Sequence, residues 1–126
     1  MAKKILVVDD EELVIESVRR LLKREGYDAT VVNSGKQALD KVREGDFDLV
    51  VSDIRMPELD GIQVIKNIRE YFRQNKKKAI PEILITGYST PESFKQAQEL
   101  RVADYIYKPF DIIDFLEVVK KSLKKG

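Results

Sequence analysis

The sequence contains neither cysteine nor histidine, and these two absences exclude several kinds of functional site. Without cysteine the chain has no disulfide, no thiol nucleophile and no thiolate metal site. Without histidine it has neither a Ser-His-Asp triad nor an imidazole ligand for zinc. A metal bound by this chain must therefore be held by oxygen atoms, which favours a hard cation such as Mg²⁺.

The chain also lacks an excess of charge and any long apolar run. Lys+Arg is 23 and Asp+Glu is 22, so electrostatics gives no case for direct binding to nucleic acid. The first apolar run, at residues 5–8, is too short for a signal peptide, and no run could span a membrane. We therefore expect a cytoplasmic protein with no membrane insertion, and a single domain over residues 1–126.

Short apolar segments alternate five times with longer amphipathic ones. The pattern predicts strands at 5–8, 29–32, 48–53, 82–86 and 104–107, and helices at 11–25, 34–44, 62–72, 91–100 and 111–123. This alternation predicts an α/β fold, a doubly wound parallel sheet of five strands with five helices. The flavodoxin-like strand order 2-1-3-4-5 is the natural choice for five strands. The inward face of the last helix is expected to hold Ile112, Phe115, Leu116, Val119 and Leu123.

Polar side chains follow four of the five predicted strands. Asp9 and Asp10 end the first, Asp53 the third, Thr86 the fourth and Lys108 the fifth. Parallel strands bring their carboxyl ends to one edge, so these groups are expected to converge. Carboxylates this close need a counter-ion, and a lysine ammonium suits a phosphoryl oxygen. The set fits phosphoryl transfer, and the hypothesis is that Asp53 becomes an aspartyl phosphate.

Over essentially its whole length the chain resembles a receiver domain of the two-component response-regulator family. Each matching motif is weak alone, but all of them occur in order, each at its predicted strand end. They are Asp9-Asp10, Asp53 with Met56-Pro57 and Asp60-Gly61, Thr86-Gly87, and Asp104-Tyr105 followed by Lys108-Pro109-Phe110.

The resemblance implies a role for each matching residue around the acceptor. Asp53 would accept a phosphoryl group from a phosphohistidine on a sensor histidine kinase or phosphotransfer protein. Asp10, Asp53 and the main-chain carbonyl of Arg55 would bind Mg²⁺, while Asp9 would hold a coordinated water. Lys108 would pair with Asp53 and then with the phosphate, and the peptide bond before Pro109 would commonly be cis. Such a domain modifies itself but turns over no external substrate, so it is not an ordinary enzyme.

The resemblance also implies a conformational switch. Thr86 would move toward the phosphate and Tyr105 would swing inward behind it. Together they would remodel the face formed by the fourth helix, fifth strand and fifth helix, where a downstream protein or a fused output domain would dock. The molecule would be a monomer or a phosphorylation-dependent dimer. Kinase, stimulus and target are not encoded in any motif.

Three features depart from the usual family pattern. Arg101 stands where many members have a glycine that ends the fourth helix, so this helix end is expected to differ. The segment 75–81 looks longer than usual. The resemblance implies that Arg55 and Tyr88, both bulky, stand beside the phosphate, where they could obstruct the attacking water. The hypothesis is slow self-dephosphorylation.

Three other classes of protein share parts of the pattern. A metal-dependent phosphatase can use an aspartate nucleophile, but no second acid stands two residues after Asp53. A nucleotide or flavin binder could share the fold, but Asp9-Asp10-Glu11 would repel phosphate where a glycine-rich turn is needed. An interaction module without phosphorylation is the third alternative, and the complete set of acceptor residues argues against it.

Overall fold

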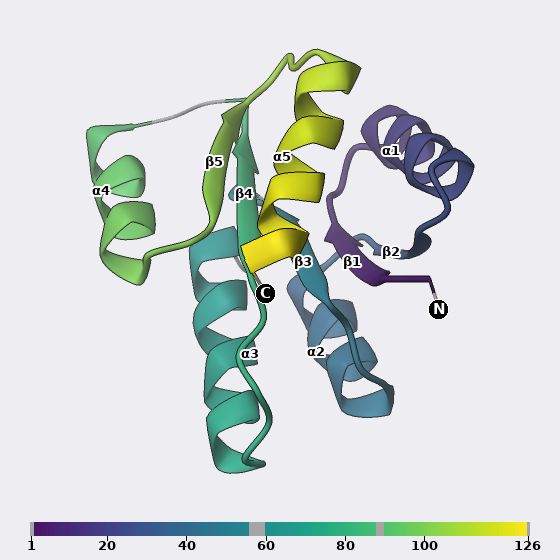
Figure 1. The fold of residues 1–126 in the computed structure, drawn as a ribbon. Helices are drawn as coiled ribbons and strands as arrows, with labels where there is room; N and C mark the ends of the chain where they lie inside the picture. Colours follow the sequence, from purple (N-terminus) through teal and green to yellow (C-terminus); the bar gives the residue numbers. More distant parts are fainter. Residues whose placement is uncertain (1, 56–59, 88–89, 126) are drawn as a thin grey trace.

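A computed structural model describes residues 2–55, 60–87 and 90–125. Its strands form one parallel sheet in the order β2-β1-β3-β4-β5, which confirms the predicted topology (Figure 1). The strands are β1 (Lys4–Val8), β2 (Asp28–Val32), β3 (Leu49–Asp53), β4 (Glu82–Thr86) and β5 (Asp104–Tyr107). The helices are α1 (Glu12–Arg24), α2 (Gly35–Glu44), α3 (Gly61–Gln74), α4 (Pro91–Leu100) and α5 (Ile112–Lys125).

Each face of the sheet has its own apolar core, because alternate strand residues point to opposite sides. On one face Leu6, Val50 and Leu84 pack with residues of α2, α3 and α4. On the other face Ile83 and Phe115 belong to the core formed with α1 and α5. Because helices cover both faces, the strands are nearly continuously apolar, as the sequence pattern predicted. All five residues of β3 are buried.

The strand registers align the carboxyl ends of four strands. Val8 pairs with Ser52, Asp53 with Ile85, and Thr86 with Tyr107. The residues that follow β1, end β3 and β4, and follow β5 therefore share one edge of the sheet. This alignment brings the predicted polar groups to one place.

Local sequence explains where most helices begin. The side chains of Ser34, Asp60 and Thr90 accept hydrogen bonds from backbone N–H groups in the first turns of α2, α3 and α4. In α4 the cap is reciprocal, because the Ser93 hydroxyl also accepts from the Thr90 N–H at 3.1 Å. Helix α1 differs, because its N-cap residue Glu11 makes no side-chain capping bond.

The end of α4 does not differ in the way the sequence suggested. Arg101 itself adopts the left-handed conformation, at φ 56° and ψ 46°. A side chain is therefore held where glycine is usually preferred, at a cost of about 1–2 kcal/mol. After α3, Lys76 also has a positive φ of 54°, and the segment to β4 forms a loop.

The predicted inward face of the last helix is wrong at one residue, Ile112. Phe115 and Val119 are fully buried, and Leu116 and Leu123 are partly buried, but Ile112 is 41% exposed. It is the first residue of α5 and does not belong to the apolar core on that face of the sheet. It lines a groove between α1 and the turn before α5.

A buried acid at the opposite end of the sheet is neutralised within the fold. Glu82, 5% exposed, opens β4, and Arg69 of α3 donates two hydrogen bonds to its carboxylate, both at 2.7 Å. A bidentate pair of this kind satisfies a charge that would otherwise be costly to bury.

Across the ranges that the structure describes, no helix is both long and apolar enough to span a bilayer.

Candidate functional site

Three carboxylates converge at the carboxyl edge of the sheet. Asp9 follows β1, Asp10 comes next, and Asp53 is the last residue of β3; one oxygen from each lies within 4.8 Å of the others. Asp9 and Asp53 are 2% and 4% exposed, whereas Asp10 faces solvent. The fold therefore brings together the three acids that the sequence singled out.

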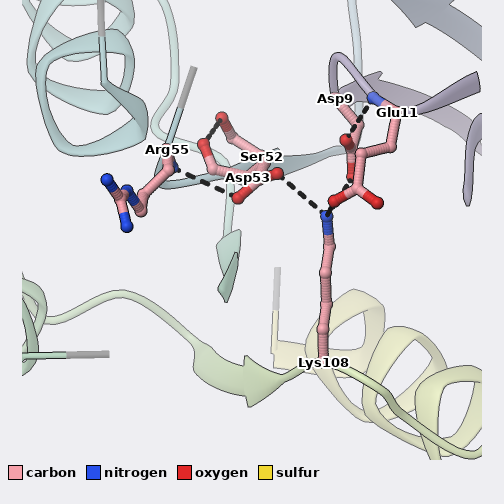
Figure 2. A network of polar contacts seen from close by, with 6 residues as sticks. All are labelled: Asp9, Glu11, Ser52, Asp53, Arg55 and Lys108. Atoms are coloured by element: carbon pink, nitrogen blue, oxygen red, sulfur yellow. Dashed lines mark hydrogen bonds and ion pairs between the residues drawn. The ribbon is translucent and has the colours of Figure 1, made fainter. Parts of the chain in front are cut away.

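Lys108 extends from the end of β5 into this cluster (Figure 2). Its ammonium donates to Asp53 Oδ2 at 2.9 Å and lies 3.1 Å from Asp9 Oδ2. It also donates to Glu11 Oε1 at 2.6 Å. Its backbone is fixed, because the Lys108 N–H donates to the carbonyl of Thr86 at 2.7 Å. The ammonium is thus the positive centre of the site.

Burial and charge oppose each other in the acid–base properties of this cluster. Burial by itself lowers the pKa of Lys108, but its hydrogen bonds to Glu11, Asp53 and Asp9 outweigh burial and raise the pKa above its usual range. Burial raises the pKa of Asp9, and hydrogen bonds from the Glu11 N–H and from Lys108 offset only part of this rise. Lys108 therefore stays positively charged in the cluster.

The backbone around Asp53 orients its side chain. The Arg55 N–H donates to Asp53 Oδ1 at 3.2 Å, and the Ser52 hydroxyl donates to the Asp53 carbonyl at 3.0 Å. One carboxylate oxygen is therefore held by Arg55 and the other by Lys108. In Figure 2 the Arg55 guanidinium points away from the acidic cluster.

Thr86 and Tyr105 occupy the neighbouring strands. Thr86 ends β4 and is fully buried. Tyr105, in β5, is half-buried; its hydroxyl lies 3.3 Å from the Ser93 hydroxyl of α4, and its ring packs edge-on against Phe94 at 5.3 Å. Thr86 thus lies at the acidic edge, and Tyr105 contacts α4 through Ser93 and Phe94.

The donor set of this edge suits a divalent cation. Asp9, Asp10 and Asp53 supply hard oxygen ligands, and one ammonium cannot balance three carboxylates and Glu11. That Asp10 and Asp53 hold Mg²⁺ is a prediction from the resemblance. The contribution of the Arg55 main-chain carbonyl and the water on Asp9 remain predictions from the resemblance.

Sequence reasoning missed Glu11, because a charged first turn is common in helices and gives no sign of a contact with a residue 97 positions away. It named Gly61 only as part of the Asp60-Gly61 motif, without a reason for the glycine. In the structure an added Cβ on Gly61 would lie 2.2 Å from the Asp53 carbonyl oxygen. Met56-Pro57 and Tyr88, which the sequence analysis also named, lie outside the described residues.

A doubly wound parallel sheet with an acidic triad and a lysine at its carboxyl edge defines a phosphorylation-switch module, and not an ordinary enzyme. The family model of the response regulator receiver domain matches residues 5–120, and the chain belongs to this family, which acts in two-component signalling. The acidic cluster is typical of the metal and phosphoacceptor site of such domains.

Similar proteins agree with this membership. The chain is 40% identical over 119 residues, 94% of its length, to the transcriptional regulatory protein ZraR of Escherichia coli. It is 36% identical over its full length to the alkaline phosphatase synthesis transcriptional regulatory protein PhoP of Bacillus subtilis. It covers only 26% and 50% of these two proteins. A CheY-like receiver domain from Methanospirillum hungatei superposes with a TM-score of 0.90 at 26% identity, covering 99% of this chain and 96% of that one.

Proposed function

We propose that Asp53 accepts a phosphoryl group from a phosphohistidine on a sensor histidine kinase or phosphotransfer protein. One observation carries the proposal: the Lys108 ammonium bridges Asp53 and Asp9 at 2.9 and 3.1 Å within a cluster of three carboxylates. These acids repel one another, and a single ammonium cannot balance the charge of all three. Residues 1–126 would act as one receiver unit.

Each neighbour of Asp53 has a task in this transfer. A carboxylate oxygen of Asp53 forms a bond to phosphorus as the bond from phosphorus to the donor imidazole breaks. Lys108 neutralises charge on a phosphoryl oxygen, and the Thr86 hydroxyl donates to another. Arg55 holds the second carboxylate oxygen through its backbone N–H at 3.2 Å. A divalent cation held by the acidic cluster would supply further charge neutralisation.

The test is incubation of the purified protein with acetyl phosphate and Mg²⁺, followed by intact-mass measurement. We expect a gain of one phosphoryl unit, and no gain when a chelator removes the metal. The proposal is wrong if the protein never gains this mass under saturating donor and if its Thr86 amide NMR signal does not shift on addition of beryllofluoride with Mg²⁺.

A groove beside the site suits a protein donor. It measures about 520 Å³ and lies between α1 and the turn before α5, with Lys108 at its edge. Leu13, 86% exposed, and Ile112 line it. The same groove is lined by apolar side chains and by Lys108, whose ammonium contacts Asp53. We therefore propose that the phosphohistidine-bearing partner docks in this groove.

The output of phosphorylation would be a switch through Thr86 and Tyr105 that remodels the α4-β5-α5 face. A downstream protein or a fused output domain would read this face. The relatives ZraR and PhoP are transcriptional regulators by name, and regulation of transcription by a larger protein is one form this output could take. Two predictions stay untested: that the domain is a monomer or a phosphorylation-dependent dimer, and that it is cytoplasmic.

Replacement of Ser93 by alanine is expected to favour the inward position of Tyr105. The substitution removes a hydroxyl that lies 3.3 Å from the Tyr105 hydroxyl and also accepts from the Thr90 N–H. We expect Tyr105 ring signals in NMR spectra to shift toward those of the beryllofluoride-bound protein, with a stability loss of about 0.5–1.5 kcal/mol. Thr90→Val is the control, because it removes the other half of the cap and keeps Ser93. Equal ring shifts in both variants would contradict the role of Ser93.

Replacement of Arg55 by alanine is expected to shorten the lifetime of the phosphoryl group. The guanidinium points away from the acidic cluster in the unmodified protein, but the long exposed side chain follows Asp53 by two residues, and we propose that it turns over the phosphoryl group and hinders the in-line water. The measurement is the decay of the phosphorylated mass after removal of acetyl phosphate, with Arg20→Ala on α1 as a control. An unchanged decay in Arg55→Ala would assign slow hydrolysis to other groups.

A further inference from the structure

Glu11 makes a short contact with Lys108 that the role of a simple helix-start acid does not explain. The distance from the ammonium to Glu11 Oε1 is 2.6 Å, shorter than the distances to Asp53 and Asp9. Glu11 is the N-cap residue of α1, yet its carboxylate caps no backbone N–H group. Its side chain turns to Lys108 instead (Figure 2).

The acidic cluster itself holds Glu11 in this position. The Glu11 N–H donates to Asp9 Oδ1 at 2.9 Å, so the backbone of Glu11 is tied to one of the three acids. Its side chain then reaches the ammonium that the same acid contacts. The Glu11 side chain is 58% exposed, whereas those of Asp9 and Asp53 are 2% and 5% exposed.

An ammonium has three N–H donors, and three carboxylates surround this one. After transfer, the donor that Asp53 now accepts can serve a phosphoryl oxygen, and a second donor becomes free for the phosphoryl group only if Asp9 or Glu11 leaves. Asp9 is buried and Asp53 carries the phosphoryl group, so both stay in place. Glu11 alone of the three has open solvent into which its carboxylate can move.

We propose that Glu11 is a positioning residue that competes with the phosphoryl group for the Lys108 ammonium and so slows phosphorylation of Asp53. In the unmodified protein it holds the ammonium beside the acids. When an anionic donor approaches, the Glu11 carboxylate repels it and keeps one N–H of Lys108 from the phosphoryl oxygens until the carboxylate moves into solvent. This inference rests on the proposed phosphoacceptor function.

The test compares the phosphorylation rates of wild type, Glu11→Gln and Glu16→Gln with acetyl phosphate and Mg²⁺. Glu16 is the matched control, because it lies on α1, is 52% exposed and pairs with Arg19 instead of the acidic site. We expect Glu11→Gln to react about two- to fivefold faster at low ionic strength, the range of a partly exposed charge pair. Glu16→Gln should match wild type.

Two further readouts separate a charge effect from a general structural one. The advantage of Glu11→Gln should shrink in high salt, which screens exposed charges. It should also be smaller with phosphoramidate, which carries one negative charge fewer than acetyl phosphate. A structural disturbance would change neither ratio in this way.

Beryllofluoride binding with Mg²⁺, followed through the Thr86 amide, tests the same competition without phosphoryl transfer. We expect tighter binding to Glu11→Gln than to wild type. If wild type forms the phosphorylated species but Glu11→Gln matches it in rate and in beryllofluoride affinity, the role of Glu11 is overturned and the phosphoacceptor function stands. If wild type neither gains the phosphoryl mass nor binds beryllofluoride, the proposed function falls and the role of Glu11 falls with it.

Discussion

A variant with asparagine in place of Asp53 is expected to gain no phosphoryl mass from acetyl phosphate and Mg²⁺, whereas wild type gains one unit. Asparagine keeps the shape of the side chain and an oxygen that can accept from the Arg55 N–H, whose present contact is 3.2 Å. It removes the nucleophilic carboxylate oxygen that Lys108 now contacts at 2.9 Å. The loss should be complete, because the proposed transfer forms its bond at this oxygen.

The control for this result is Asp46→Asn, which removes the same charge from an exposed position. Asp46 precedes β3, at the far end of the strand from the site, and pairs with Lys77 at 3.2 Å. It should be phosphorylated at the wild-type rate. Intact mass with peptide mapping distinguishes the acceptor: a phosphoryl group on Asp53→Asn would identify another residue, and buried Asp9 would be the first to examine.

The sequence was sufficient to predict the sheet order and the convergence of the acidic edge. Both follow from short-range rules: strand segments are apolar because they are buried on both faces, and parallel strands end together. Asp9, Asp53 and Lys108 could be placed on one edge without knowing any side-chain position. Their contacts of 2.9 and 3.1 Å confirm that placement.

Contacts between distant residues and backbone geometry could not be predicted in the same way. Glu11 meets Lys108 across a separation of 97 positions, and nothing in the local pattern distinguishes it from other acids of a first helical turn. Arg101 takes the left-handed conformation despite its side chain, and two residues later the Ala103 N–H donates to the main-chain carbonyl of Glu82 at 2.7 Å, where the chain enters β5. Ile112 fits the apolar stripe of the last helix, but it is the first residue of α5 and is exposed to solvent.

Replacement of Gly61 by alanine is expected to destabilise the fold and to disturb the site, although helix propensity alone would predict that alanine is stabilising. Alanine in a helix usually stabilises relative to glycine by about 0.5–1 kcal/mol. Here the added Cβ would lie 2.2 Å from the Asp53 carbonyl oxygen and 2.9 Å from the Ile54 Cα, and neither backbone atom can rotate away. The start of α3 must move from the end of β3, which also strains the 2.7 Å bond from the Gly61 N–H to the Ile54 carbonyl.

We therefore expect Gly61→Ala to lose about 3 kcal/mol of unfolding free energy in urea, where overpacking against backbone dominates. Displacement of the Asp53 backbone by roughly 1 Å should also slow phosphorylation about 100-fold. Gly45→Ala is the control: its φ of −164° is extended, and a Cβ there meets nothing within 4 Å. Its stability should change by less than about 0.5 kcal/mol. If the two variants were equally stable and equally reactive, the close packing of α3 on the backbone of Asp53 would have no part in shaping the acceptor.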